Sequence, residues 1–103
     1  MKLFLAHACL SLVSPAVYAL EFYALRRLHP RFLRKVAAGE IGRDQAVTAM
    51  SNGLKMASQV REMADHTGDL HAGISASFTR IADKMDLEIS MLRAIAYPDR
   101  AVQ

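Results

Sequence analysis

The residues best suited to chemistry gather around a predicted turn between two helices. Glu62 and His66 stand four positions apart, so on a helix both side chains face the same side, and His71 follows shortly after. A carboxylate and imidazoles at this spacing can ligate a divalent metal ion. However, the sequence has no paired Glu-x-x-His motif and no cysteine near this turn, and turns collect polar residues for solvation alone. We therefore treat Glu62, His66 and His71 as weak metal candidates and expect no bound cofactor.

Other catalytic arrangements are missing from the sequence. Cys9 is the only cysteine, which excludes an internal disulfide, and its position in an apolar segment predicts a buried, inert thiol. The sequence has no glycine-rich phosphate loop, no nucleophile with a plausible base and no close carboxylate pair in an apolar setting. We expect neither a small-molecule substrate nor enzymatic activity.

Two amphipathic helices within residues 42–97 would position this turn. In the first, apolar residues recur at helical spacing until about His66. Gly68 is the predicted end of that helix and Asp69 the predicted N-cap of the next, which a Tyr-Pro pair at residues 97–98 terminates. The stripe of the first helix consists of Val47, Met50, Leu54, Ala57, Val60 and Ala64. The pattern predicts an antiparallel helical hairpin and an all-α fold.

The second helix has the most regular apolar pattern, with spacings of three and four residues typical of coiled coils. Two helices alone cannot cover this pattern together with the methionines that flank the first stripe. We therefore expect a second hairpin or a partner to bury them. The predicted partner interface consists of Ile74, Phe78, Ile81, Met85, Ile89, Leu92, Met56 and Met63.

At the N-terminus, a cluster of cations follows an apolar segment. Residues 3–25 are apolar apart from a few positions, close to the ~20 residues that a membrane-spanning helix needs. Residues 1–39 hold six basic side chains and one acidic one, whereas residues 40–103 hold seven basic and nine acidic ones. This confined charge favours membrane lipid over nucleic acid as the anionic partner. The predicted headgroup contacts are Arg26, Arg27, Arg31, Arg34 and Lys35.

The apolar segment has more than one interpretation. We favour an uncleaved single-pass anchor at residues 1–28, with the N-terminus outside and the hairpin in the cytoplasm, because cationic flanks stay on the cytoplasmic side. Glu21 then lies at the interface near Arg26 or headgroups, and His7 at the opposite face. Alternatively, residues 1–19 are an export signal cleaved after Ala19, and residues 20–36 pack on the hairpin as a three-helix bundle. In a third interpretation, the segment is a core helix of a soluble protein.

The cationic flank is itself a predicted element at residues 29–41, a short basic amphipathic helix. Pro30 suits its first turn, and Phe32, Leu33 and Val36 share an apolar face. We expect this segment to lie along the membrane surface. Residues 98–103 complete the chain as a predicted flexible tail.

These patterns favour a small, non-enzymatic, membrane-anchored accessory or scaffolding subunit, which docks a partner or its own copy through the hairpin. The alternative is an exported periplasmic helical-bundle binding protein, which a cleaved N-terminus would identify. A second alternative is a soluble helical regulator or nucleic-acid binder, which would bind nucleic acid in a salt-sensitive manner without any membrane fraction.

Overall fold

The computed structural model describes the backbone of residues 2–98 and the side chains of residues 8–98. Every element in this range is helical, and the predicted all-α fold is confirmed. The His7 side chain and residues 99–103 of the predicted tail lie outside the described residues. In chain order the elements are α1 (Lys2–Tyr23), a π-helical turn η1 (Ala24–Leu28), α2 (His29–Ala37), α3 (Arg43–Thr67) and α4 (Ala72–Ala96).

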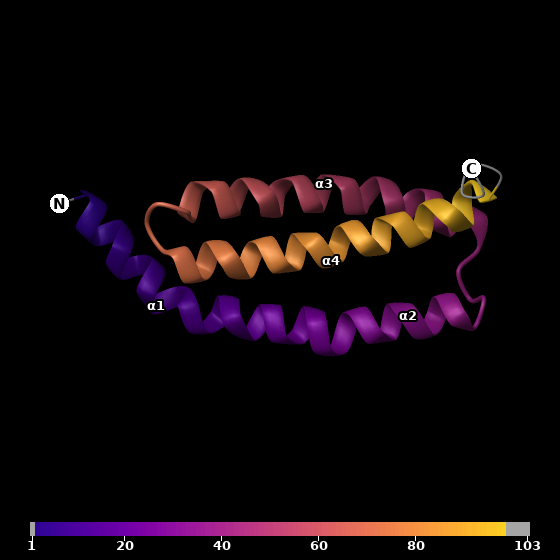
Figure 1. The fold of residues 1–103 in the computed structure, drawn as a ribbon, viewed down its shortest axis with the longest axis horizontal. Helices are drawn as coiled ribbons and strands as arrows, with labels where there is room; N and C mark the ends of the chain where they lie inside the picture. The colour runs from indigo at the N-terminus through magenta and orange to yellow at the C-terminus, as the bar shows by residue number, and fades with distance from the viewer. Residues whose placement is uncertain (1, 99–103) are drawn as a thin grey trace.

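Three long helical rods lie side by side, with α4 in the middle (Figure 1). α3 and α4 form the predicted antiparallel hairpin, and α1, η1 and α2 run along the other side of α4 as one uninterrupted helix. Among the described residues, no Cα of α1, η1 or α2 lies within 8 Å of a Cα of α3. The N-terminal part of α1 projects beyond the turn of the hairpin (Figure 1), and the longest dimension of the molecule is 54 Å.

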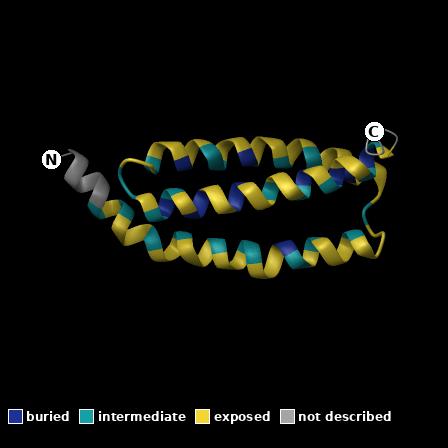
Figure 2. Cartoon of the chain, viewed as in Figure 1, coloured by how far each residue is buried: buried dark blue, intermediate teal, exposed yellow. Residues whose placement is uncertain are grey.

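Small residues on α3 bring the two hairpin helices close together. Ala46 is buried and Gly53 is half-buried, and a Cβ on Gly53 would lie 3.2 Å from Cγ1 of Ile89 on α4. Val47 and Leu54, which the sequence placed in the stripe, are 37% and 48% exposed. The prediction of Val47 and Leu54 as buried residues is therefore wrong, and the preceding residues Ala46 and Gly53 face α4 instead. The backbones of α3 and α4 lie so close together that only small side chains fit between them. Buried residues concentrate on α4 (Figure 2).

The turn of the hairpin is longer than the sequence predicted. α3 ends at Thr67, close to its expected end, but the N-cap of α4 is His71 and not Asp69. The His71 ring accepts a hydrogen bond from the backbone N–H of Ile74 at 3.1 Å, and this bond satisfies a donor that the first helical turn leaves open. Ala96 is the last residue of α4, as the Tyr-Pro pair predicted.

The residues of the N-terminal helix that lie against α4 form a seam, and their spacing along the chain shifts by one residue at η1. The seam consists of Leu10, Ser14, Val17, Glu21, Ala24, His29, Phe32 and Val36. Up to Ala24 its spacing alternates between four and three, and continuing that alternation would place Leu28, Arg31 and Lys35 against α4. The π-helical turn inserts one extra residue, with the N–H of His29 bonded to the carbonyl of Ala24. The contact with α4 is thereby shifted to the imidazole ring of His29 and the side chains of Phe32 and Val36, while the cations face outward.

Both irregular points of this helix are satisfied locally. Pro15 cannot donate to the carbonyl of Ser11, and the hydroxyl of Ser14 donates to that oxygen instead at 2.9 Å. At the other end, Gly39 has a φ of 70°. The N–H of Glu40 bonds the carbonyl of Lys35, and the N–H of Gly39 that of Val36, which is the Schellman arrangement that ends helices.

Candidate functional site

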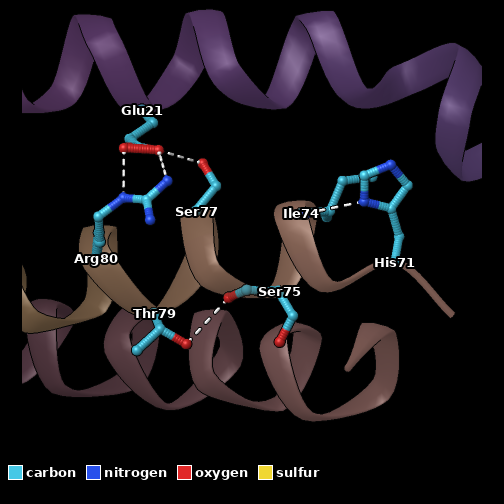
Figure 3. A network of polar contacts seen from close by, with 7 residues as sticks. All are labelled: Glu21, His71, Ile74, Ser75, Ser77, Thr79 and Arg80. Carbon is cyan, nitrogen blue, oxygen red and sulfur yellow. Dashed lines mark hydrogen bonds and ion pairs between the residues drawn. The ribbon is translucent and has the colours of Figure 1, made fainter. Parts of the chain in front are cut away.

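A polar junction joins α1 to α4 where the apolar part of α1 ends. Arg80 donates from Nε to Oε2 of Glu21 at 2.8 Å and from Nη2 to Oε1 at 2.7 Å (Figure 3). Ser77, one turn earlier on α4, donates its hydroxyl to Oε1 at 2.7 Å (Figure 3). Spacing of three residues on α4 places both donors over one carboxylate. The sequence assigned Glu21 to Arg26 or to headgroups, whereas in the structure the partners of Glu21 are Ser77 and Arg80 and not Arg26.

The junction is closed on one side and open on the other. Ser77 is fully buried, and the Glu21 side chain is 15% exposed, whereas the Arg80 side chain is 54% exposed. The hydrogen bonds to Glu21 raise the pKa of Arg80 above its usual value, so Arg80 stays charged. Because water screens the exposed guanidinium, this pair contributes more to the register between the helices than to stability.

A second polar contact lies beside the π-helical turn. His29 is buried, and its Nδ1 lies 3.4 Å from Oε1 of Glu88 on α4, with no hydrogen-bond partner among the described atoms. Ala24, Leu28, Ile81, Lys84 and Met85 complete the walls of a small cavity of about 110 Å³ at this place. Orienting a buried ring atom without a hydrogen bond is unfavourable. The contact between His29 and Glu88 therefore contributes little to the stability of the packing between α2 and α4.

The five predicted headgroup contacts all lie on the exposed surface of η1 and α2. These residues are Arg26, Arg27, Arg31, Arg34 and Lys35. Pro30 lies in the first turn of α2, as predicted, yet the backbone remains helical from Tyr23 through His29. The cationic segment is thus a direct continuation of the apolar helix and shares its axis.

One helix of the described chain, residues Ala8–Ala37, is long and apolar enough to cross a membrane. None of its most apolar stretch is buried against the rest of the chain. Leu12 is 81% exposed and Phe22 is 62% exposed. Cys9 is also exposed, so the thiol predicted to be buried has no protein cover.

The three weak metal candidates do not form a shared site in the described part of the chain. Glu62 and His66 are exposed on the last turns of α3, while the ring of His71 caps α4. Among residues 8–98, no group of three or more His, Cys, Asp or Glu side chains is close enough to hold a metal ion.

Most of the predicted partner interface lies inside the chain's own core. Ile74, Phe78, Ile81, Ile89 and Leu92 are buried, and Met85 is half-buried. α1 supplies part of this cover, since Leu10 and Val17 pack against the cluster that contains Ile74, Phe78 and Ile81. Met56 and Met63 remain 55% and 45% exposed.

An apolar groove runs along the open side between α2 and α3. Its floor is formed by Ile89 and Leu92 of α4, and its walls by Phe32 and Met56. The groove encloses about 390 Å³. It exists because the described backbones of α2 and α3 both pack on α4 with no Cα of one within 8 Å of a Cα of the other.

Ser77 and Arg80 are not among the site residues that the sequence predicted. One signal was available, because Glu21 is the only acid in residues 1–39, and α4 is uncharged from Ala72 to Thr79 before Arg80. No protein-family model, no curated protein and no solved structure matches this chain.

Proposed function

We propose that the protein is a small, non-enzymatic, membrane-anchored accessory or scaffolding subunit. In this proposal α1 holds the chain at a bilayer, and the α3–α4 hairpin docks a larger membrane complex or a second copy. The observation that carries the proposal is the exposed surface of α1, which is free of charge from Ala8 to Leu20 and is followed by exposed cations.

Two features support the choice of lipid as the partner of α1. The large exposed side chains of this helix are apolar and follow one another along its length: Leu12, Val13, Tyr18, Leu20, Phe22 and Tyr23. Contiguous apolar surface of this kind marks protein or membrane contacts. Five cations then follow on the same axis, which suits an arrangement with the apolar part in hydrocarbon and the cations among anionic headgroups.

The same charges support an orientation. Cations next to a span remain in the cytoplasm, so we propose an N-terminus outside and a cytoplasmic hairpin. Replacing Arg26, Arg27, Arg31, Arg34 and Lys35 with Gln should invert or scramble this topology. Protease protection in closed vesicles measures the outcome, and an unaltered orientation in the variant would remove the argument from charge.

The hairpin supplies the docking surface in this proposal. Its exposed methionines, Met56 and Met63, are flexible side chains that adapt to irregular partners. Met56 also lines the groove between α2 and α3, whose floor is formed by the apolar side chains of Ile89 and Leu92. Both features lie away from α1 on the α3 side of the molecule.

The first experiment is the intact mass of the protein recovered from membranes washed at alkaline pH. A mass that includes residue 1, retained through the wash, is the expected result. Loss of the protein into the wash would contradict anchoring. The matched comparison is a variant with Leu12 and Leu20 replaced by Glu, which should be extracted because two carboxylates cannot enter hydrocarbon at acceptable cost.

A second candidate, the exported helical bundle, is supported by a different observation. The contacts of Glu21, His29 and Phe32 with α4 all lie beyond the proposed cleavage site after Ala19. A cleaved chain would therefore keep the polar junction and the second half of the seam. A soluble exported protein whose mass begins at Leu20 would establish this candidate in place of the first.

A further inference from the structure

α1 covers part of the α4 surface that the sequence predicted as a partner interface. Leu10 and Val17 pack against the cluster containing Ile74, Phe78 and Ile81. Tyr18 also reaches α4, and its hydroxyl occupies the space that a Cβ on Gly73 would need. These contacts place the middle of α1 beside the first turns of α4.

That packing is incompatible with a full membrane span. Leu10 already lies against the hairpin, and the helical residues 2–9 before it add only about 12 Å at ~1.5 Å per residue. The hydrocarbon core is ~30 Å thick. If α1 spanned it while docked, the tip of the hairpin would be carried into hydrocarbon together with the exposed Glu62, Asp65 and Asp69.

The polar junction can hold α1 against α4 and can open when α1 spans a membrane, so we call it a latch. Glu21 marks the end of the apolar stretch, and its partners Ser77 and Arg80 both belong to α4. In a spanning helix Glu21 would lie at the interface, where water and headgroups can replace Arg80 as partners. The Arg80 side chain is already half exposed, so its guanidinium would remain in contact with water when it separates from Glu21.

We infer that α1 is a removable, autoinhibitory cover of α4: insertion of α1 into a bilayer opens the Glu21–Ser77–Arg80 junction and exposes the Ile74–Phe78–Ile81 surface. This inference rests on the proposed membrane-anchored function. Away from membranes, the apolar surface of α4 is protected by the chain's own helix. On a membrane, the α3–α4 hairpin remains folded and its α4 surface becomes accessible.

The accessibility of position 77 tests this coupling. Ser77 is fully buried under α1, and cysteine differs from serine by one atom, so we would place Ser77→Cys in a Cys9→Ser chain. A water-soluble maleimide is applied in buffer and with vesicles of phosphatidylcholine and phosphatidylglycerol. Ala57→Cys is the matched control, because Ala57 is buried at the seam between α3 and α4. Ser90→Cys, at an exposed position of α4, gives the unprotected rate.

In buffer, both Ser77→Cys and Ala57→Cys should react at least about tenfold more slowly than Ser90→Cys, because reaction requires local opening. With vesicles, Ser77→Cys should approach the rate of Ser90→Cys, while Ala57→Cys stays protected. Protection of Ser77→Cys on vesicle-bound protein would overturn the inference and leave the anchor proposal standing. Failure of the protein to bind vesicles at all would overturn both, and co-sedimentation separates these results.

The latch itself is tested by Arg80→Gln in the Ser77→Cys chain. Loss of the guanidinium should raise the labelling rate in buffer several-fold, without any lipid. Arg61→Gln is the matched control, because Arg61 pairs with Asp83 and Asp86 across the hairpin and not with α1. Equal labelling rates in the two variants would show that Glu21 and Arg80 do not hold α1 in place.

Discussion

The π-helical turn is the feature that most sharply tests the description of the fold. It adds one residue to the N-terminal helix and so places Phe32 and Val36 against α4. Deleting Arg27 should convert η1 into ordinary α-helix while every later seam residue keeps its place. Inserting one alanine after Arg26 should instead move Arg31 and Lys35 into the seam.

The expected free energies of unfolding follow from burial. Full burial of a Phe or Val side chain stabilises by about 1.5–3 kcal/mol, and both side chains here are half-buried, so their exposure costs about 2 kcal/mol together. The insertion variant should lose that amount. The deletion variant should remain within about 0.5 kcal/mol of the parent, because the removed side chain is on the surface.

Urea unfolding of both variants is followed by the helical circular dichroism signal. If the dependence of the unfolding free energy on urea is unchanged, the shift in the urea midpoint gives the change in stability. The second probe is labelling of Ser77→Cys, which should rise in the insertion variant only. Equal destabilisation by the deletion and the insertion would refute this reasoning, because it would show that the extra residue at η1 does not determine which residues of α2 face α4.

Three further predictions concern local features. Neither Gly73→Ala nor Gly53→Ala should raise the melting temperature, although alanine favours a helix, because a Cβ at Gly73 would meet the Tyr18 hydroxyl and lie 3.2 Å from Cε1 of the His71 cap, and a Cβ at Gly53 would lie 3.2 Å from Cγ1 of Ile89. A gain at either position would contradict this close packing. His71→Ala should lower stability by about 1 kcal/mol through the lost N-cap bond, and an unchanged melting temperature would refute that role. The Cys9 thiol should react with soluble maleimide in buffer and become protected on vesicles, so equal reactivity in both settings would place it outside the bilayer.

The sequence predicted the parts of the fold that depend on local pattern. The hairpin, the end of α4 at the Tyr-Pro pair and the first turn of α2 at Pro30 follow from periodicity and capping preferences. These features need no knowledge of distant residues, so spacing and residue type suffice for them.

The remaining features depend on contacts between distant residues. Periodicity could not choose between Ala46 and Val47, because the choice follows from how closely α4 approaches. The pairing of Glu21 with Arg80 joins residues 59 positions apart, and only the docked helix brings them together. A regular α-helical pattern does not reveal the extra residue at η1. That residue can be inferred only when the helix is known to pack on α4, because a regular helix would then turn Arg31 and Lys35 toward α4.

The small side chains on α3 and the large ones on α4 give the two hairpin helices opposite tolerances to mutation. Along the α3 seam, Ala46, Gly53, Ala57 and Ala64 supply space, so added volume is harmful there and further truncation removes little. Along α4, Ile74, Phe78 and Ile89 supply volume, so truncation leaves cavities. A saturation mutagenesis profile of the hairpin should therefore divide at the turn, with size gains selected against at these α3 positions and size losses at these α4 positions.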